Sequence, residues 1–187
     1  MNKNFFTRIL LLIVFISASL CITAQTSLKD ETRFPYGTAT GGFIQDWLII
    51  GGFPNQDDKG YNTDFLQENG GETGIKPKPG MTHKLPSGAT SAWKNYHSPY
   101  NYINIFNVLQ NGEYNPEVIY AYAKVNREND GKVILSFAQN KSNKLWVNGK
   151  LVYESRTDYQ AVLEDNQIEV NMVKGENSIL IKSVHDS

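Results

Sequence analysis

Several residues that common protein classes depend on are scarce in this 187-residue sequence. It contains one cysteine, Cys21, three scattered histidines and no Gly-x-Ser-x-Gly motif. A disulfide framework is therefore excluded, the His-x-x-x-His pair typical of zinc enzymes is missing, and so is the serine-hydrolase signature. Lysine and arginine number 18 against 19 acidic residues, without the basic surplus of nucleic-acid-binding proteins. We expect no nucleic-acid partner and no catalysis by this chain alone.

Long apolar runs are also absent. The longest, Ile9 to Ile16, has eight residues, whereas a bilayer span takes about 20. Lys3 and Arg8 make the flanking region basic, and small and polar residues follow the run. This layout predicts a secretory signal peptide over residues 1–25 and no membrane span. A membrane anchor or a lipid on Cys21 are the alternatives. We expect an exported protein, secreted or periplasmic, with no cysteine in its mature part.

The remaining chain is predicted to form a lead segment over residues 26–42 and one β-sandwich domain over residues 43–187. Residues 35–88 hold 11 of the 15 glycines and 5 of the 7 prolines, which predicts mostly loops there. The apolar segment 47–50 interrupts these loops as a short buried strand. Residues 102–109 fit either a strand or a helix.

The second half of the chain alternates apolar and polar residues, as half-buried strands do. Asn148-Gly149 separates two apolar runs, and this dipeptide is the strongest short signal for a type I′ hairpin. The sequence therefore predicts an all-β, antiparallel sandwich. Its expected strands in this half are residues 118–125, 132–137, 144–147, 150–153, 167–172 and 178–184.

Several short motifs, in their order along the chain, resemble the galactose-binding-like (jelly-roll) β-sandwich domains of secreted bacterial glycoside hydrolases. They are Trp47 to Pro54, Phe65-Leu66 with Gly70-Gly71-Glu72, Tyr120 to Ala123, Leu145 to Lys150, and Lys174 to Lys182. The resemblance implies a sugar-binding accessory domain.

The sequence departs from this resemblance in two places. Residues 139–143 stand where many relatives carry Asp-Asp-Gly, so an acidic site in that loop is not expected. Relatives also have a further strand after the segment that ends here at Val184. We therefore expect either a sandwich that lacks its last strand and exposes an edge, or the front part of a longer polypeptide, and we favour the second.

An acidic stretch is the candidate metal site. Asp57, Asp58 and Asp64, together with Asn62, crowd a short segment around Gly60. Calcium takes several oxygen ligands from flexible loops of this kind. A solvated acidic turn that binds no metal is the alternative. Calcium is the one cofactor that the sequence suggests.

Carbohydrate contacts are predicted on two loops. Sugar sites combine flat aromatic faces with polar groups that bind hydroxyls. The segment 93–102 offers such groups, and so does the loop after the hairpin. The candidate residues are Trp93, Tyr96, His97, Tyr100, Arg156 and Tyr159. Trp93 alternatively closes the end of the sandwich. Trp47, Trp146, Tyr120 and Tyr122 are on predicted strands, where core packing is favoured.

The leading functional hypothesis is an exported, non-catalytic β-sandwich that binds a polysaccharide or glycan, as the N-terminal accessory domain of a secreted hydrolase. The alternative is an interaction domain that packs against a downstream catalytic domain and contacts no sugar. A third class, an enzyme in its own right, requires a cleft with perturbed carboxylates.

Overall fold

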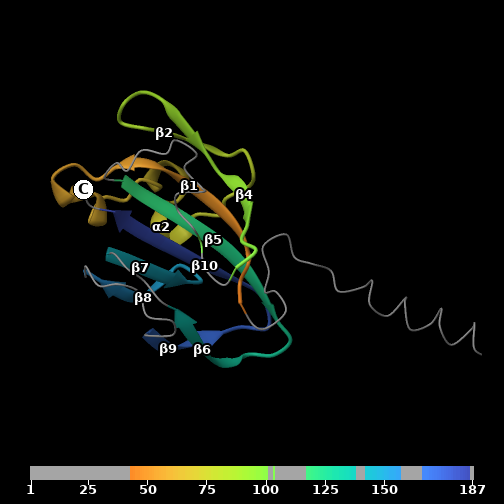
Figure 1. Cartoon of the computed structure of the whole chain (residues 1–187). Helices are drawn as coiled ribbons and strands as arrows, with labels where there is room; N and C mark the ends of the chain where they lie inside the picture. Colours follow the sequence, from red (N-terminus) through yellow and green to blue (C-terminus); the bar gives the residue numbers. More distant parts are fainter. Residues whose placement is uncertain (1–42, 101–102, 104–116, 138–141, 157–165, 186–187) are drawn as a thin grey trace, which may run out of the picture. The chain divides into compact units, whose positions relative to one another are not determined.

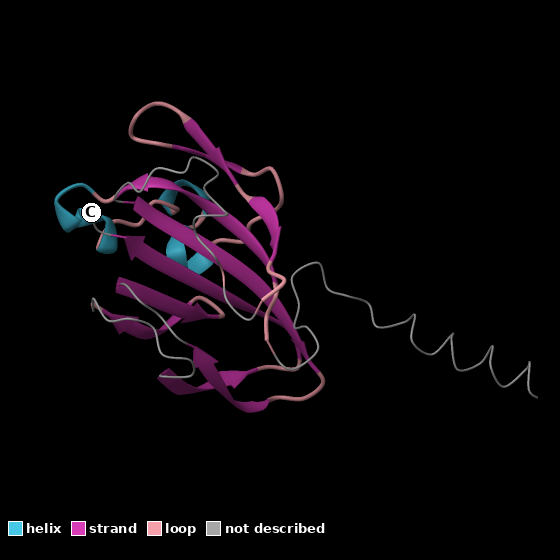
Figure 2. Cartoon of the chain, in the orientation of Figure 1, coloured by secondary structure: helices cyan, strands magenta, loops and turns pink. Residues whose placement is uncertain are grey.

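A computed structural model describes residues 43–100, 103, 117–137, 142–156 and 166–185 (Figure 1). All of these residues belong to one compact unit, Phe34–Ser187. The predicted signal peptide, the lead segment 26–42, Tyr159 and most of residues 102–109 lie outside the described residues. Strands dominate the described part, and its helices are short (Figure 2). None of these helices is long and apolar enough to cross a membrane.

The central element is a six-stranded sheet in the order β4-β1-β5-β10-β7-β8. All of its pairings are antiparallel, which confirms the predicted all-β, antiparallel fold. The strands are β1 (Asp46–Pro54), β4 (Lys94–His97), β5 (Glu117–Arg127), β7 (Ser142–Val147), β8 (Lys150–Ser155) and β10 (Gly175–His185).

β5 and β10 pair over eleven residues at the centre of this sheet. Their successive side chains point to opposite faces, and both faces are buried along most of β5. Tyr120 and Tyr122 on one face are 0% and 3% exposed, and Ile119 on the other face is 3% exposed. Core packing, the interpretation favoured for the two tyrosines, is therefore what the structure shows.

One face of the sheet is covered by residues 55–93, which we call the irregular cover. It contains the 3₁₀ helices η1 (Gln56–Tyr61) and η2 (Gln67–Asn69), the one-turn helix α2 (Gly71–Gly74), and the strands β2 (Thr82–Lys84) and β3 (Thr90–Ala92). Its buried apolar residues pack against the sheet side chains of that face. They are Tyr61, Leu66, Ile75 and Trp93, with Phe65, Met81 and Leu85 partly buried beside them.

The other face is covered in part by two paired strands, β6 (Gly131–Phe137) and β9 (Asn166–Met172), which we call the ribbon. Val170 and Met172 of the ribbon form a core cluster with Leu145, Val147 and Ile179 of the sheet. The molecule therefore has two packed β layers on this side, as a sandwich requires.

The predicted hairpin joins β7 to β8. Asn148 and Gly149 have φ angles of 50° and 77°, which fits the positive φ values that a type I′ turn needs at both positions. A Cβ atom at residue 149 would collide with the backbone oxygen of Thr73 in α2. Glycine is therefore required at this position both by the turn and by the close approach of α2.

Candidate functional site

An imidazole–carboxylate pair lies where β1 begins and β4 ends. Asp46 and His97 are directly opposite each other across the two strands. Nδ1 of His97 is 2.6 Å from Oδ1 of Asp46, and the two side chains are 60% and 33% exposed. The pair is therefore held in place by the strand register and remains open to solvent.

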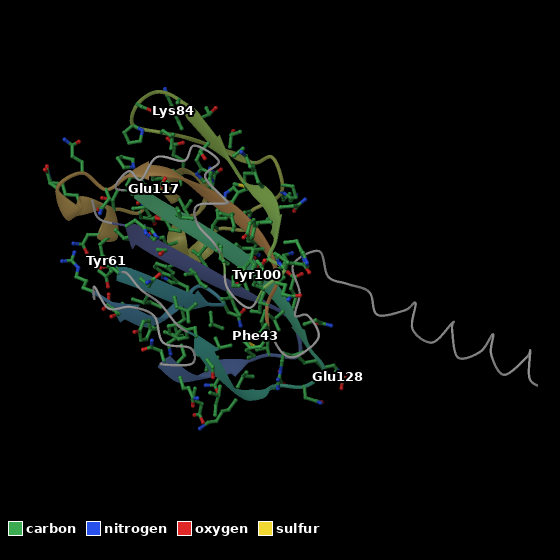
Figure 3. The ribbon with its side chains drawn as sticks, viewed as in Figure 1. Phe43, Tyr61, Lys84, Tyr100, Glu117 and Glu128 are labelled. Carbon is green, nitrogen blue, oxygen red and sulfur yellow. The ribbon has the colours of Figure 1, made fainter. Side chains whose placement is uncertain are left out.

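Two exposed aromatic side chains lie at the same end of these strands. The Ser98 amide donates to the Gln45 carbonyl at 2.8 Å, which extends the contact between the two chains one step past the Asp46–His97 pair. Phe43 is two residues before Gln45, and Tyr100 is two residues after Ser98; they are 40% and 55% exposed. Figure 3 labels both residues at this end of the molecule. We call Phe43, Asp46, His97 and Tyr100 the aromatic edge.

Tyr96 supports this edge from the sheet. It is opposite Trp47 in the β1–β4 pairing and is partly buried against the cluster that contains Trp47, Ile49 and Ile119. Segment 93–102 was expected to be a loop, and this expectation is wrong for Lys94–His97, which form the edge strand β4. The physical reason is the pairing with β1, which orders a polar segment that has little strand pattern of its own.

The predicted contact role of Trp93 is also wrong. Its side chain is only 1% exposed, and its indole Nε1 donates to Nε2 of His83 at 3.0 Å. His83 is itself buried, and burial lowers its pKa. The indole therefore fills the core under the irregular cover, as the alternative interpretation held, and cannot reach a ligand from there.

Arg156 lies on the opposite edge of the sheet from the aromatic edge. It directly follows β8, whereas His97 ends β4, and these two strands are the outermost of six. Five strand spacings of about 4.8 Å separate them by roughly 24 Å. The structure thus divides the predicted sugar contacts between two places, so they cannot form one small site. A sugar contact by Arg156 stays a prediction.

At its own edge, Arg156 contacts Tyr61. The guanidinium Cζ lies 4.4 Å from the centre of the Tyr61 ring, and Nζ of Lys144 lies 4.3 Å from the same centre. The Tyr61 hydroxyl donates to Oε2 of Glu154 at 3.3 Å. Burial raises the pKa of Tyr61, and the Glu154 carboxylate adds to this shift.

The three aspartates of the candidate calcium site are not gathered by the described structure into a group of metal ligands. Asp57 is exposed and pairs with Lys59 at 3.1 Å. Asp64 accepts the backbone amides of Leu66 and Glu72 at 2.9 and 3.0 Å, which gives it a structural role. Among the described residues, no group of three His, Cys, Asp or Glu side chains could hold a metal ion. Nothing is described of the side chain of Asp58, and calcium binding stays a prediction.

A buried charged cluster was not predicted. The Lys182 side chain is 0% exposed, and its Nζ donates to the carbonyls of Tyr61 and Thr63 at 3.1 and 2.6 Å and to Oε1 of Glu72 at 2.8 Å. The Tyr120 hydroxyl donates to the same Glu72 oxygen at 2.7 Å. Burial lowers the pKa of Lys182 and raises that of Tyr120.

The sequence did contain a signal for this cluster. Lys182 shares its strand face with Leu180 and Val184, which are apolar residues two positions away on either side. A lysine at such a position is buried and needs acceptors. The cluster holds the irregular cover on the sheet, and all three ammonium protons have acceptors within the chain.

Comparison with known proteins identifies no family for this chain. No family model matches the chain, and no curated protein matches it. Among solved structures, the β-glucuronidase of Faecalibacterium prausnitzii is 14% identical with a TM-score of 0.38. The match covers 74% of this chain and 20% of the glucuronidase, so the chain spans about a fifth of that protein. The class of protein rests on the strands themselves, which make it all-β with antiparallel sheets.

Proposed function

We propose that this chain is an exported, non-catalytic jelly-roll module that binds carbohydrate through the aromatic edge. The observation that carries the proposal is the exposure of Phe43 and Tyr100 beside the His97–Asp46 pair. Aromatic side chains exposed at one place, next to fixed polar groups, are typical of a binding surface.

Each group at this edge has a role that suits a sugar. The rings of Tyr100 and Phe43 provide flat apolar faces for the C–H groups of a pyranose. The Asp46 carboxylate accepts hydrogen bonds from hydroxyl groups. Since Nδ1 of His97 faces Asp46, its Nε2 remains to bind a further hydroxyl. Tyr96 contributes by packing under the edge and holding β4 in place.

Export and the accessory role rest on the sequence. The basic start, short apolar run and small residues before Thr26 support a signal peptide. The ordered motifs that resemble galactose-binding-like domains support a place beside a secreted glycoside hydrolase. Together with the aromatic edge, they favour a module that holds a hydrolase on its polysaccharide substrate.

Affinity gel electrophoresis of the exported protein on a panel of neutral polysaccharides tests this proposal. We expect at least one polysaccharide to retard the protein, and Tyr100→Ala to weaken the affinity by about tenfold, equivalent to about 1.4 kcal/mol. Phe43→Ala acts in the same direction. Ile134→Ala is the matched control, because Ile134 is an apolar residue that is 64% exposed on β6. If folded protein is retarded by no polysaccharide, the interaction-domain hypothesis replaces this one.

A further inference from the structure

Three cationic side chains lie close together on β10, on β7 and just after β8, toward the edge of the sheet opposite the aromatic edge. Lys144 is directly opposite Lys182 in the β7–β10 pairing, although like charges at facing positions repel. Lys144 also contributes to the lowering of the Lys182 pKa. Arg156 adds a third cation, since it contacts the same Tyr61 ring as Lys144.

Three carboxylates lie nearby: Glu72, Glu154, which is opposite Lys144 in the β7–β8 pairing, and Asp64, which acts to raise the pKa of Lys182. Glu72 is engaged by Lys182 and the Tyr120 hydroxyl, and Glu154 accepts the Tyr61 hydroxyl. Among the described residues, no carboxylate lies within ion-pair distance of Lys144 or Arg156. The three cations and three carboxylates thus balance in number, and what distinguishes Lys144 and Arg156 is that no described carboxylate pairs with them directly.

The Tyr61 ring fixes the position of both cationic groups. Both lie within 4.4 Å of its centre, and the ring is 7% exposed and anchored through its hydroxyl to Glu154. A guanidinium held over a ring uses its flat face in that contact and keeps its edge N–H groups for a ligand. Those N–H groups match the paired oxygens of carboxylate and sulfate groups.

We propose that Lys144 and Arg156, held by Tyr61, form a subsite for the carboxylate or sulfate group of an acidic glycan. An anion bound there pairs directly with both cationic groups and relieves the repulsion between Lys144 and Lys182. The inference rests on the proposed carbohydrate binding and names its substrate class. The subsite is separated from the aromatic edge by the width of the sheet, so a long acidic chain contacts both edges and a short one contacts only one.

Titration calorimetry of the full chain at low and at physiological salt tests this subsite. The carboxylate probe is an oligogalacturonate, with its fully methyl-esterified form as the uncharged match. The sulfate probe is a sulfated galactan oligosaccharide, with its desulfated form as the match. We expect at least one charged probe to bind about tenfold more tightly than its uncharged control glycan. We also expect added salt to reduce this preference for the charged probe.

Substitutions test which residues cause the tighter binding of the charged probe. We expect Lys144→Gln with Arg156→Gln to abolish it, and Lys144→Arg with Arg156→Lys, which keeps both charges, to retain at least half of it. Lys84→Gln removes one exposed charge from β2 and is expected to change nothing. Equal binding of charged and uncharged probes, or an unchanged preference in the Gln double variant, overturns the inference.

The two proposals fail in different ways. If Tyr100→Ala leaves neutral-glycan binding intact while the Gln double variant loses the charged probe, the aromatic edge is wrong and the subsite is supported. If neutral glycans bind with no preference for charged ones, the subsite alone is wrong. Binding of no probe overturns both proposals.

Discussion

The irregular cover and the ribbon shield opposite faces of one sheet by different physical means. The cover forms backbone hydrogen bonds within its short helices, its turns and the β2–β3 pair. Lys182 of the sheet donates to two of its carbonyls, and Asp64, inside the cover, accepts two of its amides. The ribbon pairs its own backbone over seven residue pairs and contacts the sheet through apolar side chains. Both layers therefore bury apolar side chains against the sheet, and the irregular cover depends in addition on the buried ammonium of Lys182, which binds two of its backbone carbonyls.

The largest expected effect comes from removing the charged anchor of the cover. Lys182→Met takes the ammonium away from the buried Glu72 carboxylate and from two carbonyls, and we expect the free energy of unfolding to fall by about 3–5 kcal/mol. Urea denaturation followed by tryptophan fluorescence measures it. The matched control is Lys132→Met on the ribbon, where the pair with Glu169 is 68% and 56% exposed and the loss is below about 1 kcal/mol. Similar losses in the two variants contradict the comparison.

An intermediate effect is expected from apolar truncation on the ribbon. Val170→Ala removes two buried methyl groups from a side chain that is 4% exposed, which corresponds to about 2 kcal/mol. Ile134→Ala on the outer side of the same ribbon changes the free energy of unfolding by less than about 0.5 kcal/mol. The same denaturation experiment measures both. If Ile134→Ala costs as much as Val170→Ala, the ribbon is not held by its inner face.

The smallest expected effect is a pH dependence confined to the cover. Burial lowers the pKa of His83 in the folded state, whereas the unfolded value is about 6.5. The unfolded chain therefore binds the proton more readily, so the contribution of neutral His83 is complete above about pH 6.5 and is lost as the pH falls toward the folded pKa. Protonation of Nε2 also removes the acceptor of the Trp93 hydrogen bond.

Thermal unfolding at intervals from pH 7.5 to pH 5 measures this effect. We expect Tm to fall less steeply with acid in His83→Gln than in the unaltered protein, because glutamine does not titrate. Its amide oxygen can still accept the indole N–H. Identical pH profiles for the two proteins would show that His83 does not sense acid.

Local signals in the sequence were sufficient for much of the fold. The alternation in residues 118–125 and 178–184 and the Asn148-Gly149 turn depend on neighbouring residues alone, and the structure has β5, β10 and the hairpin at these positions. The burial of Trp93 depends instead on residues distant in the sequence, such as His83 of β2, which accepts its indole N–H. The folding of residues 94–97 into strand β4 likewise depends on their pairing with β1. Contacts between residues far apart in the sequence produce no local alternation pattern from which they could be predicted.

Only part of the candidate site could be predicted from the sequence, for the same reason. His97 and Tyr100 were selected because they lie in a segment dense in aromatic and polar side chains, and the structure leaves both exposed. Phe43 was not selected, since its position beside that segment follows only from the pairing of β1 with β4. Arg156 was grouped with these residues because its loop is also rich in polar groups, and the strand order places it at the far edge.

The close approach of Gly149 to Thr73 bears on how the protein can be engineered. Tips of hairpins are usually where a chain accepts an inserted epitope or a fused reporter. At the β7–β8 turn there is no space even for a methyl group against α2, so an insertion there would displace the helix that carries Glu72. The turn between β2 and β3 is open, because a Cβ atom at Gly88 meets nothing within 4 Å, and it is the better place for a label.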